Sequence, residues 1–326
     1  MRLSYHHLVC MYIVFFVLGI NRLHGNFSFK NVSSFFGAHP YQEVDNREYS
    51  IAPGGTIHIK NERGNVIILT EWHKKKVRVN IRKQAQKPEY LNLMTVQESH
   101  ISDEDNNSLA LTTLCAEKNI RGSLDYIIAI PIHANLLVST GKGSIIVHEC
   151  SGPITASTDS GDIRIFNTKD TVAAKSTHKG SIFIGNAEGT VQVAAHKGNI
   201  SVQKAYNNIE ARTDKGNIHI ACATLPSTGI IDAESSSGAI HLELPDTVNA
   251  HIQGKTDHGT LTCAHSVALK SQITTLDMQA WTRFKKELEG TVGNGDAHIK
   301  LVSHYGNIKI IKSLTNKRST YRRFHA

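Results

Sequence analysis

The sequence predicts an all-β protein, a single-chain parallel β-solenoid with about 18-residue coils. A phrase of the form glycine, polar residue, Ile, any residue, Ile or Val recurs along the chain, and successive copies are 18, 19, 18 and 18 residues apart. Repetition at such a period is typical of solenoids. The residues two and four positions after each glycine are apolar, which is the alternation of a half-buried strand. The regular copies begin at Gly143, Gly161, Gly180, Gly198 and Gly216.

Residues 1–25 have the character of a secretory signal peptide. An apolar run of 13 residues, 8–20, follows Arg2, and it is shorter than the roughly 20 residues that span a bilayer. We therefore expect export to the periplasm, cell surface or extracellular space, with cleavage after Gly25. A retained N-terminal anchor is the main alternative, and we expect no transmembrane helix after this segment.

The remaining chain divides into three parts. We interpret residues 26–46 as a linker, residues 47–311 as the β-solenoid domain and residues 312–326 as a basic tail. Between consecutive phrases we expect a second strand with a large and then a small inner residue, such as Ile154 and Ala156. Adjacent coils then pair in parallel about 4.8 Å apart, and each glycine makes the corner because it adopts positive φ at little cost.

The spacing becomes irregular after Gly216. The next glycines of the phrase follow after 22 and 21 residues, and residues 276–289 interrupt the pattern. Trp281, Phe284 and Leu288 are spaced to share one face of a short helix. We expect this helix to cover the open end of the stack, and residues 295–299 and 306–310 to close the array.

Four cysteines follow the signal segment, and they allow three complete pairings between which their spacing does not choose. Cys263 occupies a core position of the phrase, so we expect a free thiol there. No CxxC pair is present, which argues against a zinc or thioredoxin-type site. The four are Cys115, Cys150, Cys222 and Cys263.

Polar residues recur at the turn before each glycine. Three positions before it, hydroxyl residues are expected to cap backbone groups of the turn; these are Thr158, Thr177, Thr213, Ser235 and Thr256. Two positions before it, His178 and His196 follow one another in successive coils and are candidates to share a metal ion. The alternative is that both are solvated, and we expect no bound metal or cofactor.

The outward positions carry the other candidates. His219, His241 and His298 repeat one outward position, and they form either a face that gains charge below about pH 6.5 or structural filler. The external carboxylates, Asp162, Asp232 and Glu234, lie where a β-helix lyase or hydrolase places its acids. Short coils leave little room for a cleft, and GxSxG and HExxH are absent, so we expect no catalytic residues.

Three longer segments resemble a known family. They are residues 61–68 (NERGNVII), 124–140 (LDYIIAIPIHANLLVST) and 288–303 (LEGTVGNGDAHIKLVS), together with the repeated Gly-Asp/Asn-Ile phrase. They resemble the bacterial "putative adhesin" domain-of-unknown-function family. The resemblance implies an all-β solenoid that is typically exported or envelope-associated, and it implies no catalytic residues.

These observations together predict a non-catalytic, exported, adhesin-like protein that binds or builds structure at the cell envelope. The formal net charge of +8 favours anionic partners, but the basic residues are scattered and no nucleic-acid motif accompanies them. The expected partner is an envelope polymer, a glycan or another protein. The alternative is a carbohydrate-active β-helix enzyme or a binder of acidic polysaccharide.

Overall fold

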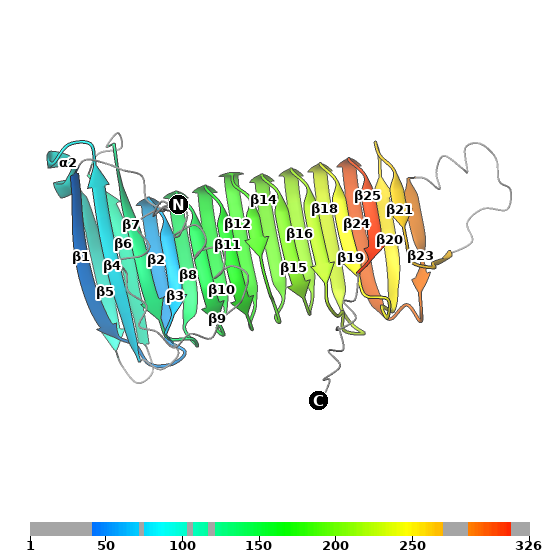
Figure 1. The fold of residues 1–326 in the computed structure, drawn as a ribbon, viewed down its shortest axis with the longest axis horizontal. Helices are drawn as coiled ribbons and strands as arrows, with labels where there is room; N and C mark the ends of the chain where they lie inside the picture. Colours follow the sequence, from blue (N-terminus) through cyan, green and yellow to red (C-terminus); the bar gives the residue numbers. More distant parts are fainter. Residues whose placement is uncertain (1–40, 72–74, 103–106, 117–120, 270–285, 314–326) are drawn as a thin grey trace, which may run out of the picture.

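The chain forms an elongated stack of β-coils (Figure 1). The computed structural model describes residues 41–71, 75–102, 107–116, 121–269 and 286–313. Two long sheets face each other, and each regular coil contributes one strand to each sheet. The neighbouring strands of successive coils are parallel, which confirms the predicted parallel β-solenoid.

The described strands form a first sheet of 12 strands and a second sheet of 13 strands. In spatial order the first sheet contains β1 (Tyr41–Ser50), β4 (Lys76–Ala85), β7 (Gly122–Ile130), β3 (Val66–Thr70), β9 (Ile145–Cys150), β11 (Ile163–Thr168), β13 (Ile182–Ile184), β15 (Ile200–Ala205), β17 (Ile218–Cys222), β19 (Ile240–Leu244), β25 (Ile308–Lys312) and β21 (Leu261–Cys263). The second contains β22 (Ala268–Leu269), β23 (Glu287–Val292), β20 (Ala250–Thr256), β24 (Ala297–Tyr305), β18 (Ile230–Ser237), β16 (Ile209–Lys215), β14 (Val191–Lys197), β12 (Val172–Lys179), β10 (Ile154–Ser160), β8 (Asn135–Lys142), β2 (Thr56–Arg63), β6 (Asn107–Cys115) and β5 (Met94–Ser102). A short helix, α2 (Glu89–Asn92), lies between β4 and β5.

The core lies between the two sheets and is aliphatic. Ile163 of β11 pairs with Ile145 of β9 and with Ile182 of β13, so equivalent residues of successive coils stack in one buried column. On the second sheet the large-then-small pattern is also buried, as at Ile154 and Ala156 of β10. Small residues on one wall let the sheets approach closely, as the sequence predicts.

The corner glycines are required by the close stacking of the coils. A Cβ atom at Gly198 would lie 2.0 Å from the carbonyl oxygen of Gly180, and one at Gly180 would lie 1.7 Å from that of Gly161. Neither Gly180 nor Gly198 has a positive φ, so the predicted reason, a left-handed turn, is wrong for these corners. Glycine is needed there because no side chain fits between one coil and the next.

Buried hydroxyl groups satisfy the carbonyl oxygens of these glycines, which confirms the predicted capping role. Each donates a hydrogen bond of 2.8–3.1 Å to a glycine of the neighbouring coil; the pairs are Thr140 and Gly64, Thr158 and Gly143, Thr213 and Gly198, Ser235 and Gly216, Ser303 and Gly238, and Thr256 and Gly306. The prediction is wrong for Thr177. The 19-residue coil shifts the column there, and Ser176 takes the inward position instead.

A second ladder runs along the same corner, one residue after the glycines. A side-chain oxygen of one coil accepts a hydrogen bond from the backbone N–H of the next coil, as between Asn199 and Asn217 at 2.8 Å. The same contact, at 2.7–2.9 Å, is made by Asn65 to Ser144, Asp162 to Ser181, Asn217 to Ala239 and Asn307 to Thr260, and also by Asp125, which follows Leu124, to Asn65. Ser144 and Ser181 make it at 3.3 Å, so the preference for Asp, Asn and Ser at this position is structural.

The order of the coils in space differs from their order in the chain at both ends. The last coil, β24 and β25, lies between the coil of β18 and β19 and the coil of β20 and β21 (Figure 1). Ile308 pairs with Ile240 on one side and Leu261 on the other. The prediction that the last two phrases close the array is wrong, because a repeat presents the same edges in every coil and its spacing does not specify which edges meet. Likewise, β2 and β3 lie between the coil of β6 and β7 and the coil of β8 and β9.

Antiparallel strands cover both ends of the stack. At one end β4 pairs with β7, β1 pairs with β4, and β5 pairs with β6. At the other end β23 pairs with β20 and β22 pairs with β23. Residues 287–289, predicted to belong to a capping helix, are part of the strand β23, and Leu288 is buried there. Residues 276–285 lie outside the described residues.

The strand β1 includes residues 41–46, which the sequence analysis assigns to a linker. The linker interpretation is wrong for these six residues. All ten residues of β1 pair with β4, but the strand is polar and has no buried face. Its stability comes from backbone pairing and from contacts such as that of Arg47 with Asp45 and Glu98, at 2.8 Å each. A strand of this kind lacks the apolar alternation by which strands are recognised in a sequence.

Two serine-to-alanine substitutions in the hydroxyl column test its capping role. Ser235 and Ser176 are both fully buried, but the Ser235 hydroxyl donates to the Gly216 carbonyl whereas the Ser176 hydroxyl has no partner in the described chain. We expect Ser235→Ala to lower the free energy of unfolding by about 1–2 kcal/mol, because a buried carbonyl loses its donor. Ser176→Ala should change it by less than about 0.5 kcal/mol or raise it. Urea unfolding followed by circular dichroism measures both; equal losses would contradict the capping role.

Candidate functional site

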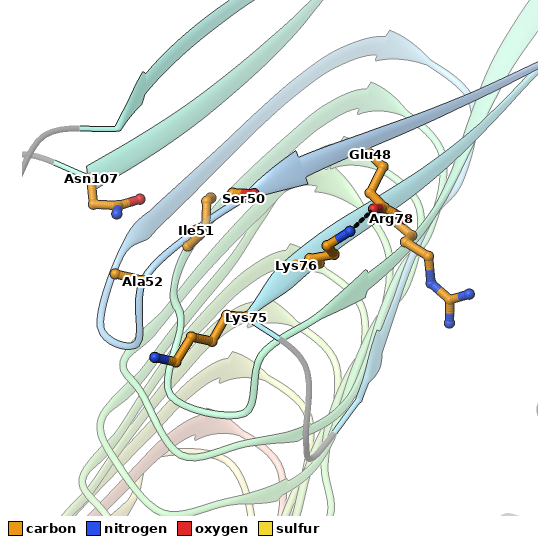
Figure 2. Close-up of a pocket in the computed structure, with 8 residues that line it drawn as sticks. All are labelled: Glu48, Ser50, Ile51, Ala52, Lys75, Lys76, Arg78 and Asn107. Atoms are coloured by element: carbon orange, nitrogen blue, oxygen red, sulfur yellow. Dashed lines mark hydrogen bonds and ion pairs between the residues drawn. The ribbon is translucent and has the colours of Figure 1, made fainter.

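A cavity of about 670 Å³ lies at the β1 end of the stack (Figure 2). It is formed where β1 ends, where β4 begins and where β6 begins, so its walls come from both sheets. Its size is within the range of ligand pockets, about 300–1,000 Å³. The residues that line it are Glu48, Ser50, Ile51, Ala52, Lys75, Lys76, Arg78 and Asn107.

The cavity has a cationic lining with one carboxylate. Lys76 forms an ion pair with Glu48, and Arg78 forms one with Glu71 outside the lining. Figure 2 shows the exposed side chain of Lys75 extending away from the Lys76–Glu48 pair. Because Lys76 and Arg78 are each paired with a carboxylate, Lys75 carries the net positive charge of the lining, and this charge favours an anionic ligand.

The floor of the cavity adds apolar and polar contacts. Ile51 is buried, and the Oδ1 atom of Asn107 is buried without a hydrogen-bond partner in the described chain. An unpaired buried acceptor is costly unless a ligand or water supplies a donor. This site was not predicted from the sequence, although the basic run at residues 74–76 was a signal for it.

Two of the three predicted outward histidines come together. His219 of β17 and His241 of β19 are opposite each other on the first sheet, with ring centroids 5.0 Å apart. His298 lies on β24 in the second sheet, where its ring is 6.2 Å from that of His251. The prediction of one face with all three is wrong, because the phrase at residues 295–299 enters the second sheet instead of the first.

Glu243 joins the His219–His241 pair. Its Oε1 atom lies 3.6 Å from Nε2 of His219, and one potential ligand atom from each of the three residues lies within 4.8 Å of the other two. Burial and the neighbouring His219 lower the pKa of His241. Two imidazoles and a carboxylate at these distances make a donor set for a metal ion.

The other predicted histidine pair is not aligned. Ser176 pairs with Ala195, so the register places Thr177, and not His178, beside His196. Nδ1 of His196 lies 2.6 Å from Oδ2 of Asp214 in the next coil. The prediction that His178 and His196 occupy one column is wrong, because the longer coil adds a residue at this turn.

The external carboxylates contact arginines on the same face. Arg212 lies within 4 Å of three carboxylates, at 2.6 Å from Glu210, 3.1 Å from Asp232 and 3.7 Å from Glu234. Arg164 contacts Asp162 at 2.9 Å. Asp232 and Glu234 lie on one strand, β18, and do not face each other across a cleft. These acids stabilise the surface of the sheets.

The four cysteines of the described chain are free thiols. This confirms the expectation for Cys263, which is half-buried, whereas Cys150 and Cys222 are buried. Burial raises the pKa of Cys115 and of Cys222 to about 11. Thiols with such pKa values are poor nucleophiles at neutral pH.

Comparisons with known proteins agree with the fold. A family model described as Toastrack DUF4097 matches residues 53–311. A comparison with curated proteins finds no match. Among the residues that the structure describes, no helix has the length and apolar character needed to cross a bilayer.

Three solved structures are similar to the chain at low identity. A putative adhesin from Bacteroides fragilis is 18% identical, with a TM-score of 0.43 over 85% of this chain and 100% of that chain. A putative cell adhesion protein from Clostridium sporogenes is 9% identical, with a TM-score of 0.28 over 83% and 100%. A putative lipid binding protein from Parabacteroides distasonis is 12% identical, with a TM-score of 0.26 over 82% and 96%.

The outward-facing residue His148 allows a test of how thermal stability depends on pH. Its ring stacks on Phe166 at 5.1 Å between centroids, and burial lowers its pKa. A histidine with a lowered folded pKa binds fewer protons when folded. The contribution of His148 to the free energy of unfolding is therefore fully present above the pKa of the unfolded state, about 6.5, and is lost as the pH falls below that value. We expect the wild-type Tm to fall between pH 6.5 and 5, and His148→Phe to reduce this fall.

The matched control is His258→Phe. His258 is exposed and stacks on Tyr305 at 4.7 Å between centroids, so this variant should keep the wild-type dependence. Circular dichroism melts at a series of pH values measure all three proteins. Identical pH dependence of wild type and His148→Phe would contradict the argument.

Proposed function

We propose that this chain, which belongs to the Toastrack DUF4097 family, is a non-catalytic, adhesin-like binding protein that is exported to the cell envelope. It takes acidic groups of an envelope polymer into the cavity at the β1 end of the stack, and the solenoid supports this site.

The cationic cavity is the observation that carries the proposal. The exposed ammonium group of Lys75 favours a carboxylate or sulfate group of the ligand. The exposed hydroxyl of Ser50 can hydrogen-bond a sugar hydroxyl, and the exposed side chain of Ala52 offers apolar contact to the face of a sugar ring. Together these groups fit an acidic sugar unit, such as a uronate, at the end or in a bend of a polymer.

The arrangement of the external acids supports binding without catalysis. Glycoside hydrolysis requires two carboxyl groups on opposite sides of the bond that is cleaved. Asp232 and Glu234 instead project from one strand and contact Arg212. The cavity itself is lined by a single carboxylate, Glu48, which is paired with Lys76. Its geometry therefore fits recognition of an acid better than acid–base chemistry on it.

Binding to acidic polysaccharides tests this proposal. We expect the full chain to bind polygalacturonate or alginate and not neutral dextran, as measured by calorimetry at low and moderate salt. Lys75→Glu should weaken binding at least tenfold, because it places a negative charge at the cavity. Lys215→Glu is the matched control; it makes the same charge change at an exposed lysine of β16, far along the stack, and should bind like wild type.

Two results would contradict the proposal. One is the absence of binding to either polymer, or equal weakening by both substitutions. The other is the release of new reducing ends or unsaturated uronates from the polymer, which would favour the carbohydrate-active enzyme instead.

Export is tested separately by the role of residues 1–25. We expect the full chain, produced in a bacterial host with a secretory pathway, to enter the exported fraction because its apolar segment suits a signal-peptide core. A chain of residues 26–326 should stay in the cytosolic fraction. Immunodetection after fractionation measures both, and a cytosolic location of the full chain would contradict export.

A further inference from the structure

We propose that His219, His241 and Glu243 form a binding site for a transition-metal dication of the zinc class on the outer face of the first sheet. The parallel register creates this site. β17 and β19 pair so that His219 is opposite His241 and Ala221 is opposite Glu243. The small side chain of Ala221 leaves Glu243 room to reach diagonally toward His219, as neighbours two residues apart on adjacent strands can.

The distances are close to those of a coordinated ion. Nε2 of His219 and Oε1 of Glu243 are 3.6 Å apart, and all three ligand atoms lie within 4.8 Å of one another. A tetrahedral zinc ion with bonds of about 2.0–2.1 Å holds its ligands about 3.3 Å apart. Side-chain adjustments of about an ångström therefore bring the three ligands to coordinating distance.

One ring nitrogen of the site lacks a protein partner. Nε2 of His241 is buried and makes no hydrogen bond in the described chain. A buried polar atom without a partner is unfavourable, and a metal ion bound there would satisfy it. The observation is independent of the distances and concerns the same histidine.

The donor set selects the class of metal. Imidazole ligands suit Zn²⁺, Ni²⁺ and Cu²⁺, whereas Ca²⁺ and Mg²⁺ require mainly oxygen ligands. Three protein ligands leave a fourth position for water or for a group of a binding partner. Lys309 is next to His241 but on β25, on the side opposite His219, and its long flexible stem lets its ammonium group turn away from the ion.

A second histidine pair serves as an internal comparison. His251 and His298 lie on the second sheet with Glu289 nearby, but the ring centroids are 6.2 Å apart and Nε2 of His251 is 3.8 Å from Oε1 of Glu289. This group does not bring three ligand atoms within 4.8 Å, unlike the first-sheet site. Its histidines therefore provide a matched control.

Calorimetric titration of the full chain, without an affinity tag, with zinc chloride tests the site. We expect His241→Ala to bind one equivalent of zinc fewer than wild type, and Glu243→Gln to weaken that equivalent at least tenfold. His298→Ala should retain the wild-type stoichiometry and affinity. Circular dichroism establishes that each variant is folded, and Glu243→Gln keeps the test valid if His241→Ala does not fold.

A spectroscopic measurement separates this site from zinc bound elsewhere. Co²⁺ in a tetrahedral site of two imidazoles and a carboxylate gives visible absorption bands, and zinc should displace them. We expect the bands in wild type and His298→Ala, and their loss in His241→Ala. Equal stoichiometry and affinity in wild type and His241→Ala, or bands that survive this substitution, would overturn the proposal. An unchanged affinity in Glu243→Gln would overturn the assignment of Glu243 as a ligand.

Discussion

The contact between corner glycines of successive coils is the constraint on which the rest of the structure depends. The backbone of one coil lies so close to the next that a Cβ atom at Gly198 would lie 2.0 Å from the carbonyl oxygen of Gly180. At most of these corners the glycine carbonyl oxygen also accepts a hydrogen bond from a buried hydroxyl, as Gly216 does from Ser235. An Asn or Asp one residue later binds the backbone of the next coil, as Asn199 does. Close approach, capped carbonyl oxygens and the side-chain ladder hold most coils in register; the exception is the longer coil of β12, where the Ser176 hydroxyl has no partner in the described chain and the column shifts.

Because the register is fixed, the spacing of residues in the sequence determines which side chains are neighbours on the outer faces. Where two coils are in phase, equivalent side chains meet, and His219 and His241 become neighbours. Where a coil is one residue longer, the turn column shifts, and Thr177 instead of His178 lies beside His196. The arrangement of acids follows the same rule, because Arg212 reaches acids on its own strand and on the neighbouring strand. Arg212 and its acids neutralise one another, whereas the His219–His241–Glu243 group keeps a ring nitrogen without a hydrogen-bond partner in the described chain.

The repeat stops at the ends of the stack, and the cavity lies at one of these ends. Antiparallel strands replace parallel coils there, and the polar, charged strand β1 forms the outer edge of the first sheet, which disfavours edge-to-edge pairing with another chain. Between the end of β1 and the beginning of β4, the two sheets leave a space of about 670 Å³. A solenoid of short coils fills its own interior with aliphatic side chains, so a concave site requires such an interruption of the repeat.

The sequence by itself determined the coil. The spacing of glycines, the paired aliphatic positions and the hydroxyl column each follow from local geometry within about 18 residues, and the structure confirms them at Ile163, Ala156 and Thr158. The family resemblance was also identified from the sequence alone, and the match over residues 53–311 confirms it.

Only the tertiary structure decided which coils are neighbours and what the ends look like. Every coil presents the same edges, so the sequence of a single coil does not determine which coils are its neighbours. The position of β25 between β19 and β21 is therefore seen only in the structure. β1 is a polar strand without an apolar face, and its existence depends on pairing with β4, whose residues follow later in the chain, from Lys76 opposite Ser50 to Ala85 opposite Tyr41. The cavity has the same origin, because it joins residues of β1, β4 and β6. The spacing of the phrase predicted one outward position for His219 and His241, whereas the approach of Glu243 to His219 depends on the pairing of β17 with β19.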